Sequence, residues 1–468
     1  MNKPSIKKNY VYQVLFRIIS MIIPVITIPY LSRVLGPLNI GIFSYLNSIS
    51  VYFILLGSLG TELYGIREIA YKQNNKYERS KVFYEIFIVR VISISISLIL
   101  FYALFCINNE YSVLNKILLI EILSNIFDIT WFYQGLEDFK KIFVRNLLIK
   151  LISLVCIFTL VQSSNDLSIY MIIYCLSIVL GNVMLWRDID KYLEKVRLRE
   201  LDIKRHLKPI MILFIPQVAV QIYMVLDKTM LGYLISDKSE VGYYEQAQKI
   251  TRFLFYLIAS LSAVIMPRVS LEYAKGNIEK VKEYLYKSFD YVFMMVVPMS
   301  LGDVCVSNVF VPIFLGNDYM KSIPILNILS ITNIIIAISN LIGSQYLLPL
   351  NRNKEYTIAC VSGAVVNIVF NWLLIPKYQA IGACMGTIIA ESVVSILQLF
   401  YVRKEIDIKN ILKMLLKYLA FSLVMCLINV GLSRYLESNV LGLMIEILIS
   451  MGVYFGMIYV YKKSAREI

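Results

Sequence analysis

The stretch PIMILFIPQVAVQIYMVLDKTMLGYLISDKSEVGYYEQAQKITRFLFYLIASLSAVIMPR (209–268) decides the fold of this chain. It holds two hydrophobic runs, each long enough to cross a bilayer as a helix, that turn near Ser236–Glu240. A rise of about 1.5 Å per residue then places Lys228 and Arg252 at similar depth, roughly 12 Å below the outer surface. A cation in the bilayer costs about 2.5–3.5 kcal/mol, so cations kept there usually line a wet cavity or a ligand path. The hairpin therefore predicts half of a cationic cavity.

The composition of the whole chain is that of a membrane protein. Its 468 residues are 58% hydrophobic and only 17% charged, and the mean hydropathy is +0.69, whereas soluble domains are roughly a quarter charged. The net charge of +14 comes from basic residues scattered between hydrophobic runs, which argues against nucleic acid as a partner. The first apolar run, from Val11 to Leu31, is long enough to span and lacks a signal-peptide cleavage site, so we expect it to remain in the mature protein.

The cysteine and histidine content gives little reason to predict a metal site or a catalytic site. The 7 cysteines form no C-x-x-C pair and lie almost entirely in apolar runs, so we interpret them as packing residues. The single histidine, His206, lies in a polar linker, which removes a multi-histidine metal site and most histidine-based catalysis. A Walker A phosphate loop is absent. We therefore predict no catalytic residue, no metal site and no resident cofactor.

Hydrophobic runs of about 20 residues recur along the chain and predict an all-α polytopic protein with about fourteen transmembrane helices. The runs are 10–32, 40–64, 82–106, 113–135, 141–162, 166–187, 209–235, 244–267, 287–314, 322–348, 355–376, 380–402, 411–433 and 438–461. Alternate connections carry 33 and 5 Lys and Arg residues, and the positive-inside rule then places both termini in the cytoplasm. The expected location is a bacterial plasma membrane.

The longest charged connection, 188–208, divides the predicted helices into groups. Six helices precede it (1–187), six follow it (209–405), and two more end the chain (406–468). Shifting the sequence by about 201 positions aligns the two six-helix groups in parallel orientation, a pattern of several transporter classes. We therefore predict two six-helix lobes in a parallel pseudo-repeat around a V-shaped cavity. The apolar residues of the connection suggest an interfacial amphipathic helix, or else a plain joiner that rests on anionic lipid.

Polar side chains follow the first helix of each predicted lobe at spacings of three and four residues. The first run carries Gln13 and Arg17, and the seventh carries Gln217, Gln221 and Lys228. Polar residues on such a stripe face protein or water rather than lipid. We therefore expect these two polar stripes to line a central cavity. Pro24 and Pro29 can also bend the first helix.

Buried cations form an inner and an outer level along the membrane normal. The inner level holds Arg17, Arg90 and Lys150, and the outer level holds Lys228, Lys249 and Arg252. The functional hypothesis is that an anionic cargo binds first to the cations of one level and then to those of the other. The alternative is local pairing: Arg90 and Lys150 with Asp128 or Glu121, and Lys228 with Asp227.

Four acids within the hydrophobic runs are candidates for coupling transport to H⁺ or Na⁺. They are Asp227, Glu245, Asp303 and Glu391. Each could equally be the structural partner of a buried cation, and the sequence leaves both interpretations open.

Several motifs in order along the chain resemble the Wzx-type flippases of bacterial polysaccharide synthesis, within the multidrug/oligosaccharidyl-lipid/polysaccharide exporter superfamily. They are PYLSRVLGPLNIGIFSY (29–45), DITWFYQGLEDFK (128–140), LDKTMLGYLISDKSEVGYYEQAQKI (226–250), AVIMPRVS (263–270) and NWLLIPKYQAIGACMGTIIAE (371–391). The resemblance spans about residues 10–405. It implies two lobes around a cationic cavity, alternating access, and a lipid-linked oligosaccharide as cargo.

The same resemblance marks individual residues. Arg17 and Arg252 match cavity arginines for the diphosphate of the cargo, and Gln134, Gln345 and Glu391 match recurrent positions without an assigned role. In related lipid II flippases two extra C-terminal helices form a groove for the prenyl tail, as 406–468 would do here. The implied partners are membrane lipids and the polymerase and glycosyltransferases of the pathway.

The alternatives come from two classes. A multidrug/cation antiporter of the same superfamily would favour acids and aromatic residues in its cavity, whereas the predicted lining here is cationic. A membrane polysaccharide polymerase would need a large outer loop with carboxylates, but every predicted outer connection has about ten residues or fewer. A non-transporting scaffold of the biosynthetic complex remains open.

Overall fold

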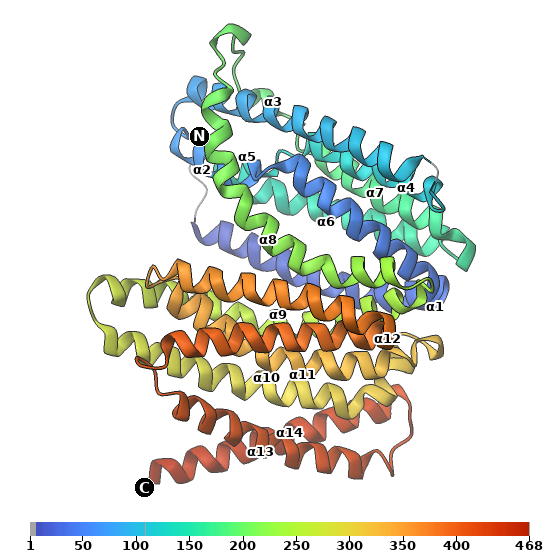
Figure 1. Cartoon of the computed structure of the whole chain (residues 1–468), viewed down its shortest axis with the longest axis vertical. Coiled ribbons are helices and arrows are strands. Elements are labelled where there is room, and N and C mark those ends of the chain that lie inside the picture. The colour runs from blue at the N-terminus through green and yellow to red at the C-terminus, as the bar shows by residue number, and fades with distance from the viewer. Residues whose placement is uncertain (1–5, 108, 468) are drawn as a thin grey trace. The chain divides into compact units, whose positions relative to one another are not determined.

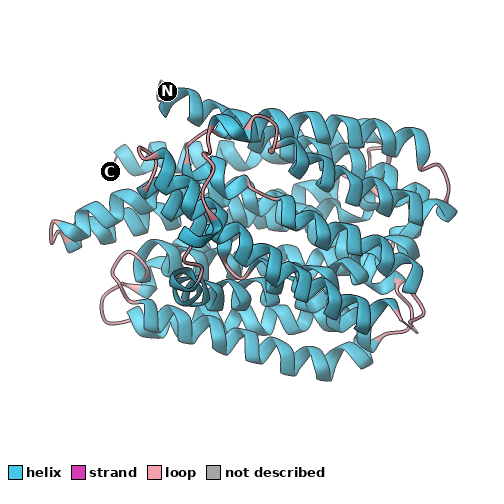
Figure 2. Cartoon of the chain, turned by 90° about the horizontal axis from the view of Figure 1, so that it is seen from above, coloured by secondary structure: helices cyan, strands magenta, loops and turns pink. Residues whose placement is uncertain are grey.

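The computed structural model describes residues 6–107 and 109–467. The side chains of 6–21, 215–216, 219–220, 222–223, 253–264 and 465–467 also lie outside the described residues. Within the described ranges the chain consists of helices joined by loops, without a strand (Figure 2). The predicted all-α class is confirmed.

The chain forms two compact units, Met1–Thr229 and Met230–Ile468. The first unit contains α1 (Ile6–Ser58), α2 (Thr61–Tyr71), α3 (Lys76–Phe101), α4 (Ser112–Ser124), α5 (Thr130–Gly135), α6 (Phe139–Leu160), α7 (Leu167–Met184) and most of α8 (Lys204–Leu234) (Figure 1). The second contains the end of α8, α9 (Ser239–Ala274), α10 (Ile278–Phe314), α11 (Ser322–Ile342), α12 (Asn353–Val402), α13 (Ile408–Leu432) and α14 (Val440–Glu467).

The helical composition agrees with a membrane protein. Nine helical stretches among the described residues are long and apolar enough to span a bilayer. The predicted runs 10–32 and 40–64 both reach into α1, and 355–376 and 380–402 both lie in α12. The number of crossings, fourteen, stays a prediction.

Four helices begin at a capping residue in a predicted cytoplasmic connection. The Asn75 and Asp138 side chains accept hydrogen bonds from the backbone N–H groups of Glu78 (3.1 Å) and Lys141 (3.4 Å). Asn277 and Asp407 cap α10 and α13 in the same way. Such a side chain satisfies one of the backbone donors that a helix start leaves unpaired. Short polar residues in the loops thus determine where these long helices begin.

Two long helices are interrupted by single residues with positive φ. In α1 the non-helical residue is Gly36 (φ 72°), followed by Pro37, rather than Pro24 or Pro29. In α12 it is Gln379 (φ 55°, ψ −130°), a conformation that a residue with a side chain rarely adopts. Each helix therefore consists of two segments, as the paired hydrophobic runs predict.

Gly382 lets the two segments of α12 approach closely. A Cβ atom on this residue would lie 2.4 Å from the carbonyl oxygen of Leu374 and 2.8 Å from the backbone nitrogen of Ile375. Small residues spaced by four permit such backbone contact between membrane helices, and Gly386 continues the pattern against Asn371.

We expect Gly382→Ala to lower the free energy of unfolding by about 3 kcal/mol, because the added methyl group meets backbone atoms that cannot rotate away. Thermal unfolding of the detergent-purified protein measures the change. Gly452→Ala in α14 is the matched control, since nothing lies within 4 Å of its added Cβ. Equal melting temperatures for the two variants would show that the segments do not pack in this way.

The connection 188–208 differs from the predicted interfacial helix. It forms two short 3₁₀ turns, Ile189–Lys191 and Leu198–Glu200, before α8 begins at Lys204. Ile189, Tyr192 and Leu193 are buried in the core of the first unit, where they pack with residues such as Phe132 and Phe83. The connection therefore does not form one continuous amphipathic helix, because these three residues pack into the protein core, and its contact with the membrane surface stays a prediction. The lobe boundaries at 187 and 209 stay a prediction, whereas the compact units meet at Thr229 and Met230.

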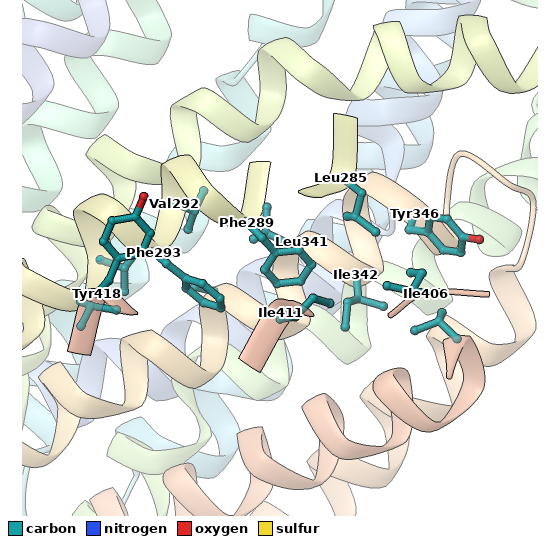
Figure 3. Packing of buried hydrophobic residues seen from close by; sticks show 14 of the residues in the cluster. Leu285, Phe289, Val292, Phe293, Leu341, Ile342, Tyr346, Ile406, Ile411 and Tyr418 are labelled. Carbon is teal, nitrogen blue, oxygen red and sulfur yellow. The ribbon is translucent and has the colours of Figure 1, made fainter. Parts of the chain in front are cut away.

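The core of the second unit forms around α10 and joins the last two helices to it. Phe289 and Phe293 of α10 lie with Leu341 and Ile342 of α11 and with Tyr418 of α13 (Figure 3). Tyr454 of α14 belongs to the same cluster, and its hydroxyl donates to the carbonyl oxygen of Met294 (2.8 Å). Helices α13 and α14 are thus packed parts of the second unit.

Candidate functional site

The predicted site residues divide between the two units. The first unit contains Gln13, Arg17, Arg90, Gln134, Lys150, Gln217, Gln221, Asp227 and Lys228, and the second contains Glu245, Lys249, Arg252, Asp303, Gln345 and Glu391. The side chains of Gln13 and Arg17 lie outside the described residues. The hairpin 209–268 itself is divided, because Lys228 belongs to the first unit and Arg252 to the second.

Arg90 in α3 is held by three groups of the first unit. Its guanidinium donates to the carbonyl oxygen of Asn125 (2.8 Å), to Thr61 Oγ1 (3.3 Å) and to Asp128 Oδ2 (3.4 Å). The residue is 2% exposed. This geometry supports the alternative interpretation of Arg90, a structural partner of Asp128, over a cation that meets cargo.

A second predicted residue, Gln217, contacts the turn between α1 and α2. Gln217 of α8 lies against Gly60, since a Cβ there would be 3.3 Å from Gln217 Nε2, and Thr61 is the next residue. Gln217 Nε2 also donates to the carbonyl oxygen of Leu213 (3.2 Å). Gln221, one turn further along α8, is exposed in the structure.

In α9 a predicted cation and a predicted acid pair with each other. Lys249 Nζ lies 3.0 Å from Glu245 Oε1, one helical turn apart. The Glu245 side chain is 11% exposed and that of Lys249 is 40% exposed. This pair fits the structural interpretation of Glu245, and its role in ion coupling stays a prediction. Lys150, Lys228 and Arg252 are half-buried, and each has a polar or electrostatic partner.

The remaining acids are distributed over α8, α10 and α12. Asp303 Oδ2 accepts a hydrogen bond from Ser330 Oγ of α11 (3.0 Å). Glu391 is 7% exposed and Asp227 is also 7% exposed. Asp227 belongs to the first unit, and the other three acids belong to the second.

The two glutamines that match recurrent positions of the flippase family have side-chain amide atoms without a hydrogen-bond partner among the described residues. Gln345 lies in a π-helical turn, Gly343–Leu347, and is 0% exposed, with no hydrogen-bond partner at either amide atom among the described residues. Gln134 in α5 has an unpartnered buried Oε1. π-Helical turns occur often at functional sites, so Gln345 stays a prediction with structural support.

A buried ionic cluster that was not predicted from the sequence lies at the start of α8. Glu85 of α3 is 0% exposed and accepts hydrogen bonds from the Asp202 backbone N–H (2.6 Å) and from the Arg205 guanidinium. His206 Nε2 lies 2.7 Å from Glu85 Oε2, and its Nδ1 lies 2.8 Å from the Tyr64 hydroxyl. His206 is 2% exposed and therefore not part of a polar, solvated linker. The available signal was Glu85 itself, an acid inside an apolar run.

An aromatic site for one lysine lies near the same end of the first unit. Lys141 Nζ lies 4.9 Å from the ring centroid of Tyr133 and 4.6 Å from that of Tyr192. Burial raises the pKa of Tyr192 to about 12, so its hydroxyl stays protonated and donates to Asp138 (3.1 Å). These contacts anchor the connection after α7 to the start of α6.

Among the described residues, no three or more His, Cys, Asp or Glu side chains lie together so that they could hold a metal ion.

Comparison with known proteins identifies relatives over nearly the whole chain. Residues 6–271 match the family described as "Polysaccharide biosynthesis protein", and residues 213–373 match the family described as "MatE". The chain is 25% identical over 412 residues to a protein of Escherichia coli (strain K12) named "Putative O-antigen transporter", covering 86% of this chain and 98% of that protein. A Haloferax volcanii protein named "Probable low-salt glycan biosynthesis flippase Agl15" is 24% identical over 236 residues, covering 50% of this chain and 48% of that protein.

The fold has a counterpart among solved structures. The structure titled "Lipid II flippase MurJ, inward closed conformation" superimposes with a TM-score of 0.77 and 20% identity, covering 97% of this chain and 99% of that chain. At this identity the likeness concerns the fold, and it extends over both units.

Proposed function

The chain belongs to the family of polysaccharide biosynthesis proteins, and we propose that it is a flippase that moves a lipid-linked oligosaccharide from the inner to the outer leaflet of the membrane. The observation that carries this proposal is the 25% identity to an O-antigen transporter over 86% of the chain. A fold like that of a lipid II flippase supports it, because that protein is also named for moving a lipid-linked cargo.

We infer that the cargo is a repeat unit linked to undecaprenyl diphosphate and that transport proceeds by alternating access. A cytoplasm-facing state would bind the diphosphate and sugars, and an outward-facing state would release them. Arginines suit a diphosphate because the guanidinium fork matches two oxygens at once. Arg17 and Arg252 are the proposed ligands, and Lys228 is a further proposed cation of the cavity. The polyprenyl tail stays in lipid while the head group crosses.

The membrane potential favours the proposed direction. Each elementary charge that crosses 100 mV gains about 2.3 kcal/mol, so a dianionic head group is driven outward from a negative interior. Export of the finished repeat unit then feeds a polymerase on the outer side, with glycosyltransferases supplying the substrate on the inner side. This order requires the predicted plasma-membrane location.

The multidrug antiporter alternative has one observation in its favour, the match of residues 213–373 to the MatE family. An antiporter for cationic drugs needs a cavity that attracts cations. Lys228 and Arg252, two of the proposed cavity residues, carry positive charges that would repel such a drug. The oligosaccharide flippase is therefore the better proposal.

A reconstitution experiment tests the proposal directly. The purified protein is placed in vesicles that contain a fluorescent undecaprenyl-diphosphate oligosaccharide, and the fraction that a membrane-impermeant quencher reaches is followed with time. The protein should speed exchange between leaflets relative to empty vesicles. If the exchange rate equals that of empty vesicles and the protein exports a cationic dye, the flippase proposal is wrong and the antiporter alternative is supported.

A further inference from the structure

A buried carboxyl group in the first unit lies outside the predicted site residues. Glu121 of α4 is 4% exposed. It follows the start of α4, Ser112, by about 13 Å of helical rise, which places it deep within the hydrophobic part of the unit. Leu118 and Ile122, its neighbours on α4, are buried in an apolar cluster. A carboxyl group in such surroundings must be compensated or neutralised.

Three neutral groups from two other helices donate hydrogen bonds to this carboxyl group. The Tyr174 hydroxyl of α7 donates to Oε1 (3.0 Å). Ser50 Oγ and Asn47 Nδ2 of α1 donate to Oε2, at 3.1 and 3.3 Å. Both oxygens are thus engaged, and each donor is an uncharged side chain.

The charged and titratable groups around Glu121 leave its charge uncompensated. Arg90 of α3 donates to the carbonyl oxygen of Asn125, one helical turn after Glu121, and pairs with Asp128. Lys116 of α4 is exposed. The other titratable neighbours on α7 and in the π-helical turn Tyr102–Cys106 are phenols and thiols rather than bases, namely Tyr170, Tyr174, Cys175 and Cys106. The described residues therefore contain no cation paired with Glu121.

We propose that Glu121 is a proton-binding site, at which the carboxylate takes up H⁺ to become a neutral carboxyl group and releases it again during transport. Binding a proton removes the charge at this buried position without moving a side chain into it. A sodium ion is the poorer occupant, because a metal ion needs oxygen lone pairs whereas these three neighbours direct hydrogens at the carboxylate. The coupling to transport rests on the proposed function, while the proton binding itself does not.

Helix α1 connects this site to α8. Ser48 and Tyr52 lie on α1 beside Asn47 and Ser50, and both contact Thr229 of α8: its Oγ1 donates to Ser48 Oγ (2.9 Å) and lies 3.1 Å from the Tyr52 hydroxyl. Thr229 is the last residue of the first unit, so α8 continues from there into the second. A proton on Glu121 weakens the acceptor of the Asn47 and Ser50 hydrogen bonds, and the resulting change in α1 reaches α8 through Thr229.

Infrared difference spectroscopy of the purified full-length protein tests the site. The carbonyl stretching band of a protonated carboxyl group should be present in the wild type, decline as the pH rises, and be missing in Glu121→Gln. The matched control is Glu279→Gln, because the Glu279 side chain is 86% exposed, and it should keep the band. Tyr174→Phe should shift the band to higher frequency, since the carboxyl group loses one hydrogen-bond donor. This second variant identifies the band even if Glu121→Gln folds poorly.

The outcomes separate the site from the transport function. No difference between wild type and Glu121→Gln at any pH at which both are folded would overturn proton binding. Loss of the band on adding Na⁺ at constant ionic strength and pH would assign the site to that ion instead. In vesicles, a pH gradient should alter leaflet exchange by the wild type but not by Glu121→Gln. A titrating band without any leaflet exchange would leave the proton site standing and overturn the flippase proposal.

Discussion

Arg252→Ala is expected to reduce leaflet exchange of the lipid-linked oligosaccharide on the order of 100-fold. A bidentate guanidinium–phosphate contact consists of two charge-assisted hydrogen bonds, together about 3 kcal/mol, and each 1.4 kcal/mol is about tenfold in binding. Arg252→Lys should reduce exchange less than Arg252→Ala does, because the lysine ammonium group keeps the positive charge but cannot make the two parallel hydrogen bonds of a guanidinium. The reduction is measured from leaflet-exchange rates in vesicles at cargo concentrations below and above saturation.

Arg268→Ala serves as the matched control for this substitution. Arg268 lies in the same helix α9 and is exposed, so its removal should leave exchange unchanged. Arg17→Ala should reproduce the effect of Arg252→Ala. If Arg252→Ala exchanges cargo at the wild-type rate while remaining folded, Arg252 is not a ligand of the diphosphate.

Glu85→Ala is expected to lower the free energy of unfolding by about 3 kcal/mol. The substitution removes the acceptor for the Asp202 N–H, His206 and Arg205, and leaves buried groups without partners. The Arg205 side chain is 39% exposed and regains water, which keeps the loss at the lower end of the range for broken buried pairs. Thermal unfolding in detergent measures the change.

An exposed ion pair provides the comparison for Glu85→Ala. Glu283 and Lys287 are paired in α10, with side chains 57% and 59% exposed, and Glu283→Ala should leave the melting temperature unchanged. The double variant Glu85→Ala, Arg205→Ala should be little less stable than Glu85→Ala alone, because the partner is already lost. Additive losses would show that Glu85 and Arg205 act independently.

The predicted site residues illustrate what local sequence can and cannot provide. The depth of Lys249 follows from its position in a hydrophobic run, but its pairing with Glu245 needed the helix register and rotamers. Arg90 looked like a cavity cation by the same criterion, yet its partners Thr61, Asn125 and Asp128 come from other parts of the first unit. The positions of charges along the sequence cannot distinguish a cation that binds a ligand from one that is paired with other residues of the protein.

The amino-acid sequence by itself determined that this is an all-helical membrane protein of the flippase type, because hydrophobic length, loop charge and ordered motifs are local properties. Only the tertiary structure decided which buried charges are already paired, that the 188–208 connection packs into the first unit, and that Glu121 has neutral donors alone. Those outcomes depend on contacts between helices far apart in the chain, such as the one joining Glu121 to Tyr174. Hydrophobicity drives each helix into the bilayer separately, whereas packing of the helices against one another selects the partner of each polar side chain.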